Sequence, residues 1–314
     1  NQRASNGRLI LLMDDLAKLL LKRPHTQYRG RFAPSPSGLL HFGSLIAALA
    51  SYLQAKSQNG IWLVRIDDID KPREMPGATQ KILTTLESYG LHWDESVLYQ
   101  SQQQNLYKDI LATLQSNHLS YYCRCSRAQI KASGGIYQGT CRKANHSSEN
   151  SAIRLINNFP VETFHDGIQA PIKVSAALAK EDFIIHRRDG LFAYQLACVV
   201  DDIYQNISEV VRGCDLLEPT ARQLTLFATF GHQAPKYCHV PLAVTSEGYK
   251  LSKQNLAPAI DNNNPQPALI AALQFLGQKP PKELQASSVT EIINWAVQHW
   301  QLSAVPKKPE ISLN

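Results

Sequence analysis

The sequence predicts an α/β fold built on a parallel, doubly wound sheet. Strand-like apolar runs alternate with helix-like patterns along the first 120 residues, which is typical of that class. The run 61–66 is a compact apolar strand of the kind found at the centre of a parallel sheet. The chain of 314 residues is 44% hydrophobic and 18% charged. That composition can fill a core and excludes a disordered chain.

The first half of the sheet is expected to end near residue 120. Residues 28–33 form a short strand, and the cluster Pro34–Gly38 predicts a turn after it. Residues 45–56 carry apolar side chains on nearly every face, as a buried helix does. After the strand 61–66, two more helices are indicated by the apolar positions Ile82, Leu83, Leu86 and Tyr89 and by Leu106, Ile110, Leu111 and Leu114.

The second half resumes after an interruption. Residues 121–180 hold clustered cysteines, glycines and a polar stretch, and they are interpreted as an insertion. The alternation returns at Phe183, with strands predicted at Leu196–Val200 and Glu209–Arg212 and a helix from about Pro219. A polar linker after residue 262 leads to two helices, the second opened by a capping box at Ser288, and the tail is expected to fray.

These features divide the chain into five parts. Residues 1–26 are expected to be an extension outside the fold, 27–120 and 181–262 the two halves of the main domain, 121–180 the insertion and 263–314 a small helical region. No run reaches about 18 apolar residues, so no membrane segment is expected. No secretory signal is visible at the start, so a cytoplasmic protein is expected. We also expect a monomer. The net charge of +6 is compatible with a nucleic acid partner without requiring one.

Two segments far apart in the chain have the residue types of a nucleotide site. Arg31–Ser44 spans the turn from the first strand into the first helix, where free backbone N–H groups attract anions. Within it, His41 adds a phosphate donor, and Gly43 allows close approach of a nucleotide. Lys250–Gln254 is a loop with two lysines that could reach the same phosphates. Either segment alone is weak evidence.

Together the two segments resemble the signature motifs of class I aminoacyl-tRNA synthetases. The similarity extends over about residues 28–260, and it is specific to the glutamyl/glutaminyl branch. The supporting segments are Arg31–Gly43, Arg65–Asp70, Asp182–Gly190, Val199–Asp202 and Glu209–Gly213 with Arg222 and Gln223. The resemblance implies a Rossmann-like catalytic domain that uses ATP with Mg²⁺ to activate L-glutamate.

The short remainder after the lysine loop narrows the resemblance. About sixty residues follow it, too few for a large anticodon-binding domain. The chain is therefore similar to the short paralogues, the glutamyl-queuosine tRNA(Asp) synthetase family, which attach glutamate to queuosine in the anticodon loop of tRNA(Asp). A truncated glutamyl-tRNA synthetase that charges the 3′ end of a tRNA stays open as the alternative. A small-molecule nucleotidyltransferase and a non-enzymatic RNA-binding paralogue are opposed by the glutamate-site arginines and by intact His41 and Lys253.

The resemblance also implies a glutamate site. Arg31 and Arg212 would bind the two carboxylates, because guanidinium groups match them in shape and charge. Ser35 and Tyr194 would supply hydroxyl hydrogen bonds. Asp67 would hold the ammonium group; the family usually has glutamate there, so a water bridge or a shifted ammonium is possible.

The ATP site is implied in the same way. His41, Gly43, Lys250, Ser252 and Lys253 would bind ATP, with His41 and Lys253 as the catalytic residues. The signature motifs depart from the wider class at three positions, where Ser44, Leu251 and Gln254 stand. Members of the branch vary at these positions, so activity is still expected.

Three of the six cysteines suggest a structural zinc site. Cys123, Cys125 and Cys141 lie within nineteen residues and would supply three ligands. A structural zinc ion takes four, so one ligand has to come from another residue. By the usual preference of zinc for its ligands, His146 is the first choice for the fourth ligand and His118 a weaker second choice. The resemblance instead indicates Tyr137. Three thiols without metal are the remaining alternative. The other three cysteines are interpreted as small buried hydrophobes, and no disulfide is expected.

Overall fold

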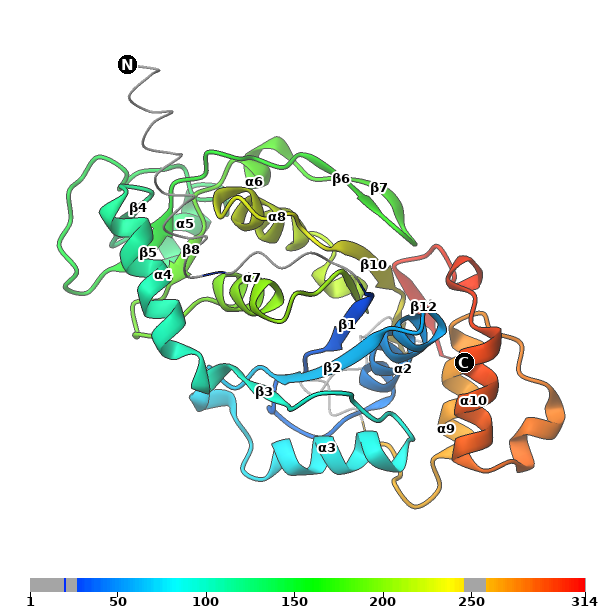
Figure 1. The fold of residues 1–314 in the computed structure, drawn as a ribbon. Helices are drawn as coiled ribbons and strands as arrows, with labels where there is room; N and C mark the ends of the chain where they lie inside the picture. The colour runs from blue at the N-terminus through cyan, green and yellow to red at the C-terminus, as the bar shows by residue number, and fades with distance from the viewer. Residues whose placement is uncertain (1–19, 21–26, 246–257, 314) are drawn as a thin grey trace.

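The computed structural model describes residue 20 and residues 27–245 and 258–313 (Figure 1). A parallel sheet lies at its centre. β1 pairs with β2, β2 with β3, and β9 with β10, all in parallel. These strands are β1 (Arg29–Phe32), β2 (Ile61–Ile66), β3 (Leu98–Tyr99), β9 (Glu209–Gly213) and β10 (Lys236–Val240).

The two parts of this sheet meet where β9 lies beside β1. The backbone N–H of Ser208 donates to the carbonyl of Arg29 at 2.9 Å, and the N–H of Arg29 donates to Ser208 Oγ at 2.8 Å. Helix α2 (Phe42–Ser57) packs against β1, β2 and β9. The carboxyl ends of β1 and β9 therefore open at one edge, the usual place for a ligand in such sheets.

The helices cover the sheet, and the two largest hydrophobic cores among the described residues lie beneath them. Around α2, one core joins the strands to the C-terminal helices; the other lies among α4, α7 and α8. The remaining helices are α3 (Ala78–Ser88), α4 (Gln104–Ser116), α5 (Arg127–Ala132), α6 (Ala176–Ala179), α7 (Tyr194–Tyr204), α8 (Thr220–Thr229), α9 (Gln266–Phe275) and α10 (Val289–His299). Short 3₁₀ turns are η1 (Lys71–Arg73), η2 (Gln100–Gln102), η3 (Cys214–Leu216), η5 (Lys282–Ala286) and η6 (Leu302–Ala304).

Antiparallel strands lie in the segment interpreted as an insertion and at its two borders. β4 pairs with β5, β5 pairs with β8, and β6 with β7 forms a hairpin. The strands are β4 (Ser120–Cys123), β5 (Ala152–Leu155), β6 (Thr163–Asp166), β7 (Ala170–Lys173) and β8 (Ile184–His186). The hairpin packs against β10, so it reaches the main sheet (Figure 1).

The prediction of a strand at Leu196–Val200 is wrong, because these residues lie within helix α7. The burial of α7 explains the error. Leu196 to Ile203 are all buried, so the apolar run has no polar face that would reveal a helical period. A short apolar run cannot by itself distinguish a buried helix from a strand. The strand predicted at Glu209–Arg212 is confirmed as β9, and Ser288 caps α10 with the expected capping box.

The expectation of a frayed tail is also wrong. β12 (Glu310–Ser312) pairs in parallel with β11 (Leu242–Val244), and Leu242 N–H donates to the carbonyl of Pro309 at 2.9 Å. The edge of β11 gives the tail a backbone partner far away in the sequence, which the tail's own residues do not reveal. Of residues 1–26, the structure describes Leu20, which is buried in the core between α4, α7 and α8.

Candidate active site

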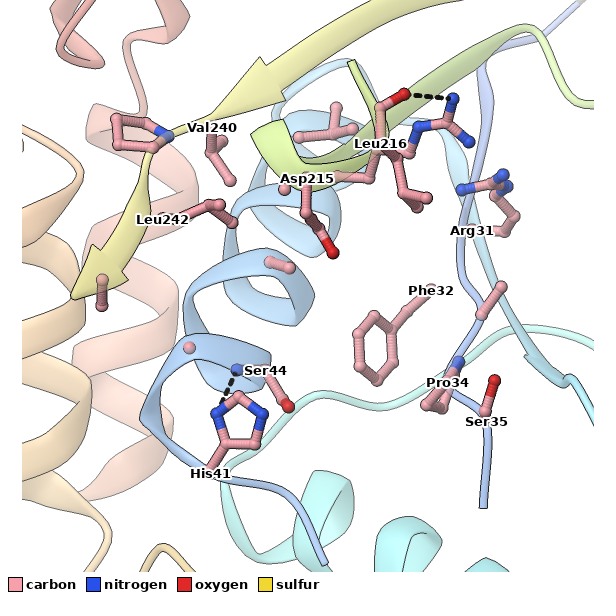
Figure 2. A pocket seen from close by; sticks show the side chains of 18 of the residues that line it. Arg31, Phe32, Pro34, Ser35, His41, Ser44, Asp215, Leu216, Val240 and Leu242 are labelled. Atoms are coloured by element: carbon pink, nitrogen blue, oxygen red, sulfur yellow. Dashed lines mark hydrogen bonds between the residues drawn. The ribbon is translucent and has the colours of Figure 1, made fainter. Parts of the chain in front are cut away.

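A cavity of about 430 Å³ opens at the carboxyl ends of β1, β9 and β10 (Figure 2). It lies between the turn after β1, the start of α2 and the chain that follows β10. Its lining residues are Arg31, Phe32, Ala33, Pro34, Ser35, Ser37, His41, Gly43, Ser44, Ala47, Tyr194, Val211, Arg212, Gly213, Asp215, Leu216, Val240, Pro241, Leu242 and Ala243.

Six of the residues assigned from the sequence line this cavity. They come from three separate segments of the chain, and they are Arg31, Ser35, His41, Gly43, Tyr194 and Arg212. Asp67 does not line it. Lys250, Ser252 and Lys253 lie outside the described residues.

The start of α2 forms one wall. His41 is the N-cap residue, and its Nδ1 accepts a hydrogen bond from the backbone N–H of Ser44 at 3.4 Å (Figure 2). Gly43 lies in the first turn, where helix N–H groups have no partners within the helix. This wall can therefore receive an anion such as a phosphate.

The described residues on both sides of 246–257 lie at this wall or near it. Leu242 lines the cavity before that segment, and after it Ala259 forms a bridge with His41. The N–H of Ile260 donates to the carbonyl of Leu40 at 3.1 Å. Leu242 and Ala259 thus lie beside the same cavity although they are seventeen positions apart in the sequence.

Arg31 belongs to a buried ion cluster, which consists of Arg31, Arg65, Asp67, Asp201 and Asp202. Arg31 Nε and Nη2 each bind a carboxylate oxygen of Asp202 at 3.0 Å, which leaves Nη1 as the remaining nitrogen. Arg65 Nη1 binds Asp202 Oδ1 at 2.6 Å. Burial by itself would raise the pKa of Asp202, but the two guanidinium groups lower it to about 2.

Asp67 lies at the other end of this cluster. Its Oδ1 accepts from Arg65 Nε at 2.9 Å, while its Oδ2 is buried and has no hydrogen-bond partner among the described residues. Burial raises the pKa of Asp67, and Arg65 opposes that shift. Burial likewise raises the pKa of Asp201 to about 7, against the effect of Arg65. The cluster holds three carboxyl groups and two guanidinium groups, so it carries one surplus negative charge when all three carboxyl groups are ionised.

Arg212 projects from β9 with no carboxylate bound to it in the described part of the chain. Its Nη2 donates to Thr220 Oγ1 at 2.8 Å and to Gln223 Oε1 at 2.7 Å. Its Nε donates to His239 Nε2 at 3.0 Å. Nη1 is buried and lacks a partner among the described residues. A buried, partnerless guanidinium nitrogen beside a cavity is suited to an anionic ligand.

Several residues of the site were missed from the sequence. Asp215, two residues after β9, points into the cavity (Figure 2). Arg65 and Asp202 belong to the motifs quoted above without a role of their own, although a charge within the apolar run of β2 and another within that of α7 were a usable signal. Asp166 and His239 are joined through space over 73 positions, and nothing local in the sequence indicates their pairing.

The three clustered cysteines come together as predicted. The Sγ atoms of Cys123, Cys125 and Cys141 all lie within 4.8 Å of one another. Tetrahedral zinc with Zn–S bonds of about 2.3 Å would place its sulfur ligands about 3.8 Å apart, so the donor set fits. The Tyr137 hydroxyl accepts from the N–H of Cys141 at 2.7 Å and lies in the same buried cluster. His146 and His118 do not join the group of possible ligands among the described residues.

A buried arginine accompanies these cysteines. Arg154 Nε lies 3.2 Å from Cys123 Sγ, and the guanidinium lies 3.7 Å from the centre of the Tyr137 ring. Burial opposes ionisation, yet Arg154 holds the pKa of the Cys123 thiol below its usual value. All six cysteines are free, and Cys198, Cys214 and Cys238 are buried as expected.

The sequence matches the profile of a known family over residues 27–309, described as tRNA synthetases class I (E and Q), catalytic domain. A protein of Colwellia psychrerythraea named glutamyl-Q tRNA(Asp) synthetase is 61% identical over 315 residues, covering 95% of this chain and 100% of that protein. A protein of the same name from Escherichia coli O157:H7 is 58% identical, covering 90% of this chain and 92% of its own length.

Solved structures agree on the fold. A glutamate tRNA ligase of Elizabethkingia meningosepticum, crystallised with its amino acid, superposes with a TM-score of 0.74 at 24% identity. The match covers 90% of this chain and 66% of that one, so the chain spans about two thirds of that structure. No helix among the described residues has the length and apolar character needed to cross a membrane. From the profile match and the identity to these relatives, the chain belongs to the class I glutamyl and glutaminyl tRNA synthetase family, among the glutamyl-Q tRNA(Asp) synthetases.

Proposed function

We propose that this protein activates L-glutamate with ATP and transfers the glutamyl group to queuosine in the anticodon loop of tRNA(Asp). The relatives that carry this name are 55–61% identical over most of the chain. The structural observation that carries the proposal is the cavity, which combines a helix N-terminus for phosphate with a buried, partnerless Arg212 nitrogen for a carboxylate. An anionic amino acid and a nucleotide can therefore bind side by side.

The reaction has two steps. A carboxylate oxygen of glutamate attacks the α-phosphorus of ATP, which releases pyrophosphate and leaves glutamyl-adenylate. A hydroxyl of the queuosine ring then attacks the activated carbonyl and releases AMP. Because the protein mainly positions charged reactants, binding and charge stabilisation account for the catalysis.

For glutamate, Arg31 and Arg212 bind the two carboxylates from neighbouring strands. Each arginine presents one nitrogen rather than a full fork, because the others are already bonded within the protein. Ser35 and Tyr194 add hydroxyl groups to the cavity. The ammonium group is directed to the ion cluster, where Asp67 Oδ2 is the available acceptor, directly or through water.

For ATP, His41 and Gly43 receive phosphate at the start of α2, and Lys250, Ser252 and Lys253 complete the site with Mg²⁺ bound to the nucleotide. Lys253 acts on the departing pyrophosphate, whose charge grows as the bond breaks. Its replacement by alanine should lower kcat for glutamate-dependent pyrophosphate exchange by about 10²–10³. Unchanged kcat with weaker ATP binding would instead make Lys253 a nucleotide clamp.

We further propose that Cys123, Cys125, Cys141 and Tyr137 hold one structural Zn²⁺ in an inserted subdomain. The spacing of the sulfur atoms and the buried tyrosine hydroxyl support this donor set. Bound zinc would link β4 to the loop that follows α5, which has few apolar contacts of its own. Elemental analysis should find one zinc per chain and Cys125→Ser should lose it; an ordered protein without metal, purified without chelators, would contradict the site.

The transfer reaction can be tested directly. Purified protein, ATP and labelled glutamate are incubated with tRNA(Asp) that either carries or lacks queuosine, and the tRNA is analysed on acid gels and by mass. Label only on the queuosine-bearing tRNA supports the proposal. Label that survives without queuosine would instead support charging of the 3′ end. We also propose a monomer that acts in the cytoplasm, which sedimentation and fractionation can check.

A further inference from the structure

A hydrogen-bond chain runs from Arg212 through the ring of His239 to the carboxylate of Asp166. Its Nε donates to His239 Nε2 at 3.0 Å, and His239 Nδ1 lies 2.6 Å from Asp166 Oδ2. Asp166 and His239 are both at most 1% exposed. Asp166 ends strand β6, His239 lies on β10 and Arg212 on β9, so three strands meet at this chain.

The hydrogen bonds determine the tautomer of the histidine. Arginine Nε always carries a proton, so His239 Nε2 must be the acceptor and cannot be protonated. The proton of the neutral ring is then on Nδ1, where it is donated to Asp166. Burial lowers the pKa of His239 although Asp166 opposes that effect, which agrees with a neutral ring.

The carboxylate of Asp166 is itself held in place. Its Oδ1 accepts from the backbone N–H groups of Ile168, Gln169 and His239 at 2.9–3.1 Å, which leaves Oδ2 for the imidazole. Stacking of the Tyr237 ring, 11° from parallel to the imidazole, restricts the histidine further. The hydrogen bond to Asp166 and the stacked ring of Tyr237 thus both restrict the orientation of His239.

We propose that Asp166 and His239 are positioning residues that orient Arg212 for the substrate carboxylate while leaving its positive charge uncompensated. A carboxylate bonded directly to Arg212 would compete with the substrate for that charge. A neutral imidazole directs the guanidinium without this competition, and Nη1 remains available at the cavity. This inference deepens the proposed glutamate activation and rests on it.

Asp166→Asn is the sharpest test because it changes one hydrogen bond. The amide oxygen can replace Oδ1 and keep the three backbone bonds, while the NH₂ group faces His239 Nδ1. The imidazole must then move its proton to Nε2, where it opposes the N–H of Arg212 Nε. The KM for glutamate in pyrophosphate exchange should rise at least tenfold, whereas the KM for ATP should change by less than threefold.

Two further variants separate orientation from folding. His239→Gln can place an amide oxygen near the Nε2 position and should keep the KM for glutamate within about fivefold of the wild type. His239→Phe keeps a ring of similar volume but has no hydrogen-bond acceptor. It should raise the KM for glutamate as much as Asp166→Asn does. Asp94→Asn, a matched loss of one carboxylate outside the cavity, should leave both KM values unchanged.

A second measurement does not depend on turnover. Nitrogen-15 NMR of histidine-labelled protein should show His239 with Nε2 unprotonated in the wild type and protonated in Asp166→Asn. A protonated Nε2 in the wild type would overturn the proposal, and so would an unchanged KM for glutamate in Asp166→Asn. Absence of any glutamate-dependent exchange in the wild type would count against the proposed function, while the tautomer would still test the positioning role.

Discussion

The two arginines that face the cavity are held in opposite ways. Arg31 gives two nitrogens to the carboxylate of Asp202, within a cluster whose members are at most 5% exposed. Arg212 is held by a hydroxyl, an amide and a neutral imidazole, and no carboxylate bonds to it in the described structure. Both are equally buried, so their difference is one of charge compensation rather than of exposure.

This difference separates two tasks. The Arg31 side stabilises the joint between β1 and α7 and offers its surplus negative charge to an ammonium group. The Arg212 side keeps a positive charge for a carboxylate. One glutamate molecule carries both kinds of group, so each side of the cavity suits one part of it. The following predictions test this division.

Removal of Asp202 should have the largest effect on stability. Asp202→Asn leaves Arg31 and Arg65 buried with one carboxylate fewer, and loss of a partner from a buried pair typically costs about 3–5 kcal/mol. Urea unfolding should show this loss. Arg212→Gln should cost much less stability, because its partners are neutral; equal losses would mean that both arginines are mainly structural.

Removal of Arg212 should have the largest effect on substrate binding. Arg212→Gln withdraws the uncompensated charge from the cavity, and a desolvated charge pair is worth about 2–5 kcal/mol. The KM for glutamate in pyrophosphate exchange should therefore rise by about 30-fold or more. The KM for ATP should change far less, because its phosphates bind at the start of α2. A parallel rise in the KM values for glutamate and ATP would contradict the division.

Asp67→Asn should also weaken glutamate binding, towards the lower end of that range of about 2–5 kcal/mol. The reason is that Asp201 and Asp202 still supply negative charge to the ammonium group. Asp67→Glu, which restores the residue usual in the family, should be tolerated. Titration of glutamate against both variants provides the comparison, and similar small effects from both would place the ammonium elsewhere.

Acid should produce the smallest effect on the Arg212 side, through protonation of His239. The groups around His239 are Asp166, Arg212, Asp215, Tyr237, Cys214 and Thr220. Burial lowers the pKa of His239, so the neutral ring persists above the ordinary histidine pKa of about 6.5 and is lost only at lower pH. Protonation of His239 should raise the KM for glutamate below that pH, while Asp201, whose pKa burial raises to about 7, titrates on the Arg31 side. His239→Gln, which cannot titrate, should remove only the His239 part of this profile.

Much of the site could be predicted from the sequence because its residues lie in contiguous motifs. His41 and Gly43 follow a strand and open a helix; by itself this order is weak evidence for a phosphate site, and it becomes specific only together with the lysine loop. Cys123, Cys125 and Cys141 lie close in the chain, so their convergence was also predictable. The strand predicted at Leu196–Val200 failed because a fully buried helix has no polar face to mark its period.

The residue types needed for the chemistry can be read along the chain: a helix start for phosphate, three thiols for a metal and, through the resemblance, two arginines for carboxylates. How each arginine is held depends on the folded arrangement. That depends on which side chains meet across strands, as Asp166 meets His239 over 73 positions and Arg31 meets Asp202 over 171. Local sequence carries no record of such pairings, because burial and the order of strands in the sheet bring them about.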